Sequence, residues 1–299
     1  MGEASVTGER TEIHVLTGPT AVGKTDAAIA WAEAHDAEIL SCDSVCVYRG
    51  MDVGSAKPTR EQRSLVRHHG IDLADPTERF SVTRYVECAR QAVQAAAERG
   101  RRILVTGGSG FYLAAFFGPV ADEVEIPPAV SEEVRRLFNS GLEPLLARLR
   151  EVESAPLPDW LDIRNPIRVA KALERRLSSG RPLTELRETF LTRPGPFEGC
   201  KITCDILDRP DDELRRRIAL RTESMLSQGL IEEAEWLLSL NLDPELPSAR
   251  AVGYRATMDW LEGGRRLPRE ALAERINLDT WALVRKQRKW FNRLGLNDS

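Results

Sequence analysis

Short apolar runs alternate with helical patterns over the first third of the chain. Residues 12–16 (EIHVL), 38–42 (EILSC) and 102–106 (RILVT) each read as a strand. Residues 24–35 and 82–98, which lie between these runs, carry helical patterns. Strands that alternate with helices are typical of parallel βαβ units, so we expect a parallel sheet covered by helices.

The rhythm changes between residues 120 and 200, where no strand pattern is clear and apolar residues recur at helical spacing. Asn165 and Pro166 form an N-cap and N1 pair that opens a helix, and Gly180 ends it. Residues 201–207 (KITCDIL) return to a strand pattern, and helices dominate from 211 onward. The pattern predicts an α/β core of residues 1–119 and 201–299, interrupted by a helical insertion domain of residues 120–200.

The first glycine turn matches the phosphate-binding P-loop, G-x-x-x-x-G-K-[ST], at every fixed position. It follows a strand and opens a helix, so backbone N–H groups and the helix N-terminus favour phosphate oxygens there. The predicted diphosphate-binding residues are Gly18, Pro19, Thr20, Ala21, Val22, Gly23, Lys24 and Thr25. Lys24 is expected to reach a terminal phosphate and the Thr25 hydroxyl to ligate Mg²⁺. The fold class is therefore α/β, with a P-loop NTPase-like parallel sheet core, a helical insertion and a helical C-terminus.

Two further residues follow predicted strands. The strand at 102–106 lacks the terminal acid that orders Mg²⁺ in P-loop NTPases and runs instead into a glycine turn that carries Ser109. Ser109 is either an anion or base contact or part of a structural turn. Asp43 follows the second strand at its carboxyl end, where open α/β sheets bind their ligands. It is either a surface cap or the group that accepts a proton from an attacking amine.

Arg221 lies on the apolar stripe of a predicted helix, three residues after Ile218. A charge on a core-facing stripe needs a partner, because burying an unpaired charge is costly. A bound phosphate is one such partner, and an acidic side chain is the other.

The composition, with 42% hydrophobic and 29% charged residues, is that of a globular protein. No apolar run is long enough for a membrane span, and the polar first twelve residues do not resemble a secretory signal. Five scattered cysteines suggest reduced thiols and a cytoplasmic location, with zinc binding by the two C-x3-C pairs a minor alternative.

The net charge of −4 is unevenly distributed. Residues 250–299 hold eleven Lys/Arg and six Asp/Glu, a balance of +5, so the rest carries −9. Basic side chains also recur at helical spacing, as Arg168, Lys171 and Arg175 in the insertion and as Arg285, Lys289 and Arg293 beside Trp290 and Phe291. Such faces suit RNA, although a solvated amphipathic helix gives the same pattern.

Several motifs together resemble the tRNA dimethylallyltransferase family. The blocks that carry the resemblance are GPTAVGKT (18–25), DSVCVYRGMDVGSAKP (43–58), the His-His segment (68–72), GGSGFY (107–112), IRVAKALE (167–174), SMLSQGLIEEA (224–234), RAVGYR (250–255) and VRKQRKWF (284–291). They keep their order over about 275 residues. The departures include Ser109 where the family usually has threonine, and the segment 151–164.

The resemblance implies an enzyme that transfers a dimethylallyl group from dimethylallyl diphosphate to N6 of the adenosine 3′ to the anticodon of tRNA (position 37). The expected cofactor is Mg²⁺, the expected partner is the anticodon stem-loop of tRNA, and the expected state is a monomer. Asp43, Ser109 and Arg221 are the expected catalytic residues, with Asp43 as the base. The residues expected to bind tRNA are Asp43, Ser44, Val45, Cys46, Ser109, Ile167, Arg168, Val169, Ala170, Lys171, Arg250, Gly253, Tyr254, Arg255, Arg285, Lys286, Gln287, Lys289 and Trp290.

Three competing interpretations remain at the level of the residues. The first is a small-molecule kinase that uses ATP, which the lack of an acid-ended strand disfavours. The second is a prenyltransferase that acts on free adenosine nucleotides, which would not need two basic helical regions. The third is an RNA-binding or GTPase-like switch module without catalysis, which leaves Asp43 and Ser109 unexplained.

Overall fold

The computed structural model describes residues 11–120, 124–153 and 155–296. Residues 1–10, used above to argue against a secretory signal, lie outside the described residues, as do residues at the predicted insertion boundary and at the C-terminus. The contacts between residues divide the chain into two compact units, one of residues 1–120 and 195–299 and one of 121–194. None of the helices in the described part of the chain combines the length and apolar character that crossing a bilayer requires.

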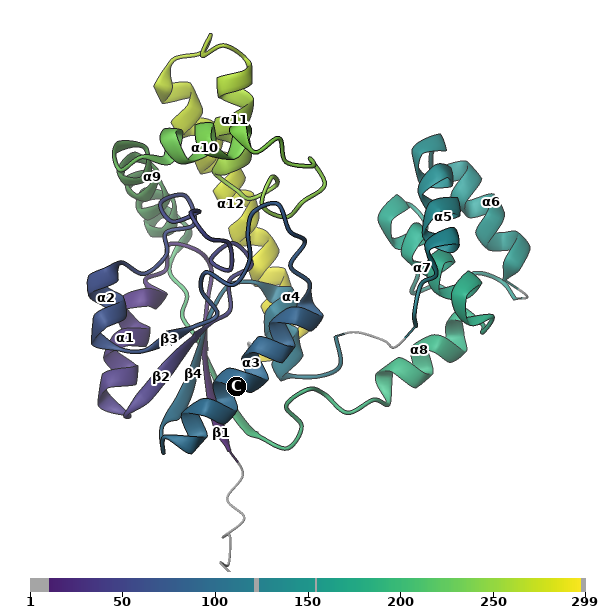
Figure 1. Cartoon of the computed structure of the whole chain (residues 1–299), viewed down its shortest axis with the longest axis horizontal. Coiled ribbons are helices and arrows are strands. Elements are labelled where there is room, and N and C mark those ends of the chain that lie inside the picture. The colour runs from purple at the N-terminus through teal and green to yellow at the C-terminus, as the bar shows by residue number, and fades with distance from the viewer. Residues whose placement is uncertain (1–10, 121–123, 154, 297–299) are drawn as a thin grey trace, which may run out of the picture. The chain divides into compact units, whose positions relative to one another are not determined.

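A five-stranded parallel sheet forms the centre of the first unit (Figure 1). Its strands are β1 (Glu12–Thr17), β2 (Ala37–Ser41), β3 (His68–His69), β4 (Arg102–Gly107) and β5 (Lys201–Ile206). The order across the sheet is β3-β2-β4-β1-β5. The predicted strands and their parallel arrangement are confirmed, and β3 is an additional short edge strand formed by the two histidines.

Helices cover both faces of this sheet. The helices of the first unit are α1 (Lys24–Ala34), α2 (Arg60–Leu65), α3 (Val82–Glu98), α4 (Gly110–Leu113), α9 (Asp211–Ser227), α10 (Leu230–Ser239), α11 (Tyr254–Glu262) and α12 (Arg269–Arg293), with a 3-10 turn η1 (Ala114–Phe116). Side chains of α1 pack with Ile39 and Leu104 on one face, whereas α3 packs with Leu40 and Val105 on the other. Because successive strand residues point to opposite faces, both faces of the buried strands are apolar.

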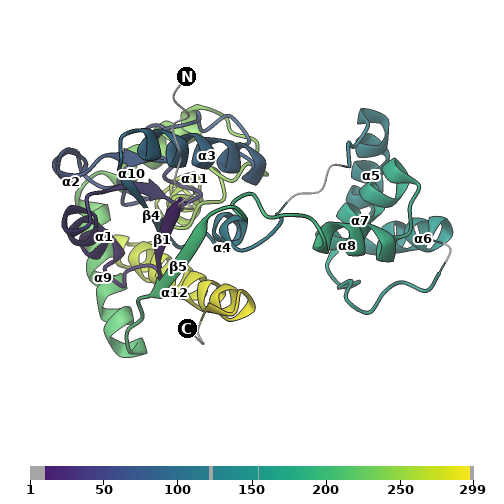
Figure 2. The same cartoon turned by 90° about the horizontal axis from the view of Figure 1, so that it is seen from below.

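The C-terminal helices bring distant parts of the sequence to the P-loop. Helix α12 packs along α9, and a cluster of Leu214, Ile218, Trp281 and Val284 joins them to Val22 of the loop. Figure 2 shows α12 passing beside both α9 and α4. This packing places the last helix of the chain next to the loops that follow β1 and β4.

The second unit, residues 121–194, is helical in its described part. It contains α5 (Pro128–Ser140), α6 (Leu142–Val152), α7 (Pro166–Ser179) and α8 (Leu183–Leu191) around a leucine-rich core. The Asn165 side chain caps α7 by accepting from the N–H groups of Ile167 and Arg168, and Gly180 ends it at φ 69°. The predicted start and end of this helix are confirmed. The unit ends at Pro194, because Phe197 packs in the core of the first unit, stacked on Phe116.

Candidate functional site

A cavity of about 750 Å³ lies at the carboxyl ends of the parallel strands. Its walls come from the P-loop, the segment after β2, the turn after β4, and helices α9 and α12. The predicted site residues that line it are Thr20, Ala21, Gly23, Lys24, Thr25, Asp43, Ser44, Val45, Cys46, Ser109, Arg221, Arg250, Gly253, Lys286 and Gln287. Segments far apart in the sequence therefore meet where an open α/β sheet binds ligands.

The P-loop adopts a tight turn between β1 and α1. Gly23 begins α1 with φ 103°, a left-handed conformation that side chains other than glycine rarely adopt. The Lys24 ammonium donates to the carbonyl oxygens of Gly18 (2.8 Å) and Pro19 (2.7 Å). Gly18 and Pro19 do not line the cavity, and the Val22 side chain is buried against α9 and α12. The loop therefore holds Lys24 at the cavity through its own backbone carbonyls.

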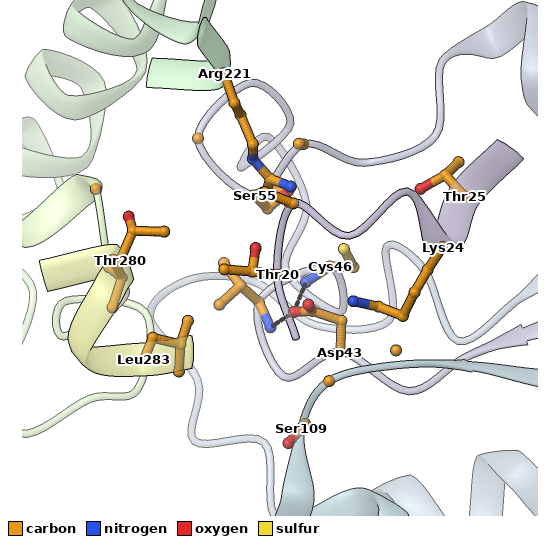
Figure 3. A pocket seen from close by; sticks show the side chains of 18 of the residues that line it. Thr20, Lys24, Thr25, Asp43, Cys46, Ser55, Ser109, Arg221, Thr280 and Leu283 are labelled. Atoms are coloured by element: carbon orange, nitrogen blue, oxygen red, sulfur yellow. Dashed lines mark hydrogen bonds between the residues drawn. The ribbon is translucent and has the colours of Figure 1, made fainter. Parts of the chain in front are cut away.

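Positive charge is concentrated around Lys24. Burial and, to a smaller extent, the nearby Arg221 guanidinium lower the pKa of Lys24 to about 8, while Asp43 acts in the opposite direction. Figure 3 shows the Lys24 side chain directed toward Asp43, with Arg221 entering from α9. Two cations held near one carboxylate leave the cavity with a local excess of positive charge. An anionic group such as a diphosphate would relieve the repulsion between them.

Asp43 is held in place by its own backbone turn. One carboxylate oxygen, Oδ1, accepts from the N–H groups of Val45 (2.8 Å) and Cys46 (3.4 Å). This local bonding matches one of the two alternatives considered for Asp43, a cap, yet Asp43 also lines the cavity. Because Oδ1 fixes the carboxylate, the side chain is pre-oriented for a second task with its other oxygen.

The glycine turn after β4 forms the wall opposite Arg221 (Figure 3). The Ser109 N–H donates to the carbonyl of Cys42 (3.1 Å), which ties this turn to the end of β2. Ser109 starts helix α4, but its hydroxyl caps no N–H of that helix. The backbone of Ser109 is therefore structural, whereas its hydroxyl lies on the cavity wall.

Arg221 is largely buried, and burial lowers the pKa of its guanidinium while Asp43 raises it. Its guanidinium donates a hydrogen bond to the backbone carbonyl of Ser55, at 3.3 Å. Among the described residues, Arg221 forms no salt bridge with a carboxylate, and Asp43 acts on it only through its charge. The remaining interpretation, a contact with a bound phosphate, fits its position in the cavity.

Two residues at this site have roles that sequence reasoning missed. Gln287 was expected to bind tRNA, but it is buried; its Oε1 accepts from the Thr20 N–H (2.9 Å) and its Nε2 donates to the Gly108 carbonyl (3.0 Å). It therefore joins the P-loop to the turn after β4. Arg217 lines the cavity and donates to the Ala21 carbonyl (2.7 Å). Its spacing of four residues from Arg221 on one helix was the available signal.

The remaining C-terminal residues are divided between surface and core. Arg285, Lys286 and Lys289 are exposed, while Trp290 is half-buried against α4. Phe291, taken as a neighbouring RNA-binding aromatic, is instead buried in the core at 1% exposure. It cannot present its ring to RNA in this structure.

Around α11, Arg250 reaches the cavity but also pairs with Glu245, and Arg255 pairs with Asp259 at 2.8 Å. Tyr254 is fully buried; its hydroxyl donates to Glu233 (2.6 Å) and accepts from the Gly54 N–H (3.1 Å). The expected tRNA contact of the Tyr254 side chain is therefore incompatible with its burial.

In the helical unit, Ile167, Arg168 and Lys171 are exposed on α7. Val169 and Ala170 pack in the leucine-rich core, so their side chains are not available to tRNA. The expected basic stripe is weakened because the Lys171 ammonium bonds Glu174 at 2.7 Å.

The cavity contains oxygen atoms suited to Mg²⁺, those of Thr25 and Asp43. Among the described residues there is no group of three or more His, Cys, Asp or Glu side chains that would hold a metal by itself. Mg²⁺ usually needs only one or two protein oxygens when substrate phosphates and waters complete its shell. The residues present therefore fit Mg²⁺ that arrives with a diphosphate.

Comparison with known proteins gives the family. The sequence model described as IPP transferase matches residues 46–294. The chain is 50% identical to a tRNA dimethylallyltransferase of Opitutus terrae, over 95% of this chain and 90% of that protein. The chain belongs to the IPP transferase family. It is also 38% identical to a tRNA dimethylallyltransferase of Chloroflexus aurantiacus, over 95% of this chain and 93% of that protein.

Solved structures agree with this IPP transferase fold. A tRNA isopentenylpyrophosphate transferase of Bacillus halodurans superposes with a TM-score of 0.65 at 29% identity, covering 95% of this chain and 87% of that one. A eukaryotic dimethylallyltransferase shares the fold at 21% identity, with a TM-score of 0.74 over 94% of this chain and 70% of that one. The family match begins at Cys46, so the P-loop and Asp43 lie before it.

Proposed function

We propose that this protein is a tRNA dimethylallyltransferase, which moves the dimethylallyl group of dimethylallyl diphosphate to N6 of the adenosine 3′ to the anticodon (position 37). The observation that carries the proposal is the convergence of the P-loop, Asp43, Ser109 and Arg221 on one cavity. The 50% identity to a tRNA dimethylallyltransferase along nearly its whole length supports the choice of substrates.

In the proposed reaction the leaving group is stabilised by the charges around the P-loop. The bond between C1 of the allyl group and the diphosphate oxygen breaks, and the oxygen keeps the electron pair. Lys24, Arg221 and the P-loop N–H groups compensate the developing negative charge, as preorganised donors do in other enzymes. Bound Mg²⁺, held by the Thr25 hydroxyl together with the diphosphate, would supply further neutralising charge.

Asp43 is the proposed base. As the new bond forms between N6 and C1, the amino group loses a proton, and the Asp43 carboxylate accepts it. The turn formed by Val45 and Cys46 holds this carboxylate at the cavity wall before substrate arrives. Ser109, on the wall opposite Arg221, is the proposed hydrogen-bonding partner of the adenine (Figure 3). Because the target base is stacked in the anticodon loop, it must be flipped to enter the cavity.

The direct test is mass analysis of unmodified tRNA incubated with the protein, dimethylallyl diphosphate and Mg²⁺. We expect one dimethylallyl group per tRNA at the adenosine 3′ to the anticodon. Transfer to free adenosine nucleotides, ATP consumption without transfer, or tight RNA binding without product would each point to one of the competing functions. We propose that the enzyme acts as a monomer in the cytoplasm.

Donor binding should weaken as the pH rises above about 8. The free Lys24 ammonium has a pKa of about 8 and loses its proton in this range, whereas a bound diphosphate would keep it charged. Each pH unit above 8 should therefore raise the donor Kd by about tenfold. Calorimetric titration with dimethylallyl diphosphate at several pH values checks this. The last ionisation of the diphosphate lies at about pH 6, so the donor keeps a constant charge above pH 8. Lys24→Met should bind weakly with a flat profile; a flat profile in the native protein would contradict the assignment.

The exposed cations of α12 should set the salt dependence of tRNA binding. Replacing Arg285, Lys289 and Arg293 by alanine should lower affinity and reduce the slope of log K against log salt by about one unit per lost phosphate contact. A control triple variant at Arg265, Arg266 and Arg269 removes the same charge from another exposed segment. Equal slopes in the two variants would show that the α12 cations only face solvent.

A further inference from the structure

An exposed aromatic ring stands next to the cavity. Phe111 of α4 is 52% exposed, although it lies two residues from Ser109 on the cavity wall. Single exposed apolar side chains are common on protein surfaces and need no explanation. Phe111 differs because Trp290 packs against its ring and an exposed cation, Arg293, lies over the Trp290 ring.

Trp290 of α12 supports Phe111 from one side. The two rings meet edge to face, with centroids 6.2 Å apart and planes at 84°. A Cβ atom on Gly110 would lie 2.3 Å from Cγ of Trp290, so only glycine allows the indole to pack this closely against α4. Edge-to-face contact is a preferred arrangement of aromatic pairs, and it limits the positions open to the Phe111 ring.

Arg293 completes a group of three side chains that we call the aromatic platform: Phe111, Trp290 and Arg293. The Arg293 guanidinium lies 5.3 Å from the Trp290 ring centroid, within the range of a cation–π contact. Figure 2 shows α4 and α12 side by side. This packing brings Phe111 together with Trp290 and Arg293, although they lie far apart in the sequence. The platform continues outward from the wall formed by Ser109, Lys286 and Gln287.

The surroundings of the platform favour an anionic partner. Arg285, Lys286, Lys289 and Arg293 are exposed on α12, and no carboxylate of the described residues lies within 4.0 Å of any of them. Arg288 on the same helix is bound instead to Asp208 (2.8 Å) and Asp211 (2.6 Å). These four α12 cations are thus available to a ligand, whereas Arg288 is paired.

We propose that the aromatic platform stacks an unpaired base of the RNA loop, next to the adenosine that enters the cavity. This inference rests on the proposed function. A flipped base leaves its neighbours in the loop without a stacking partner. Single-stranded RNA satisfies both features of the surface, because its bases stack on aromatic and guanidinium planes while its phosphates contact cations.

The test uses an anticodon stem-loop with 2-aminopurine beside the target adenosine, whose fluorescence reports stacking. Phe111→Leu keeps an apolar side chain but removes the π-face, so it should raise the RNA Kd by roughly tenfold, within the range for one lost base stack. It should also leave the bound 2-aminopurine brighter than in the native complex. Phe111→Tyr should restore both values. Phe117→Leu is a matched control, because Phe117 is also exposed (36%) but lies outside the platform.

Donor binding separates this inference from the proposed function. Dimethylallyl diphosphate should bind Phe111→Leu and the native protein equally, since Phe111 does not line the cavity. If the native protein binds the stem-loop without modifying it, the proposed function fails while the fluorescence test still applies. Unchanged RNA affinity and fluorescence in Phe111→Leu would overturn the platform. A loss of self-association in that variant, with normal RNA binding, would overturn it in favour of contact between two copies.

Discussion

Asp43→Asn should reduce kcat for prenyl transfer by roughly 10²-fold or more while leaving tRNA affinity near normal. Asparagine keeps the Oδ1 atom that accepts from Val45 and Cys46, so the local turn should survive. Only the ability to accept a proton from the adenine amino group is lost. Single-turnover measurements of prenyl transfer, with tRNA affinity measured separately, check this result.

Asp26→Asn is the matched control for Asp43. Asp26 is another carboxylate that lines the same cavity, but it lies in the first turn of α1 near Gln62. We expect Asp26→Asn to keep most of the activity. If high Mg²⁺ restores the transfer rate of Asp43→Asn, Asp43 acts through the metal. If the variant is fully active without raised Mg²⁺, Asp43 has no part in the mechanism.

Arg221→Leu should lose about 10²–10³-fold in transfer rate without losing stability, because its guanidinium contributes to leaving-group stabilisation but not to folding. Arg221 lies on the α9 stripe with Ile218 and Met225, both buried, and leucine suits that environment. It also lowers the pKa of Lys24, so its removal should shift the Lys24 pKa upward from about 8. Transfer kinetics, thermal unfolding and the pH dependence of donor binding measure these three effects.

Arg216→Leu provides the control for Arg221. Arg216 is an exposed residue of the same helix, so the variant removes the same charge away from the cavity. It should transfer the dimethylallyl group at close to the native rate. If Arg221→Leu is as active as Arg216→Leu, Arg221 is a structural residue. If it unfolds, its bond to the Ser55 carbonyl is needed for folding.

The local parts of the site could be predicted from the sequence. Each local part lies directly after a strand: the P-loop after β1, Asp43 after β2 and the turn at Ser109 after β4. Such features can be recognised from a few neighbouring residues, because strands and helices have fixed periods. Glycine also indicates positions where the backbone adopts a positive φ. The stripe on α9 likewise predicted that Arg221 faces inward.

Contacts between distant helices could not be predicted in this way. Gln287 is separated from Thr20 by 267 positions, and Arg217 from Ala21 by 196, yet both bind the P-loop backbone. Packing between helices also buries Tyr254 and Phe291 in the core of the first unit and Val169 in that of the helical unit, although the motifs alone presented them as RNA contacts or their neighbours.

The sequence by itself therefore determined the P-loop, the acid that follows β2 and the fold class. The tertiary structure alone decided which side chains of α9 and α12 contact the P-loop, and which residues instead fill the core. The physical reason is that periodicity specifies the face of a helix but not the partner that this face meets. That partner is fixed only when the helices pack. Val22 of the P-loop, for example, is buried against Leu214 of α9 and Val284 of α12.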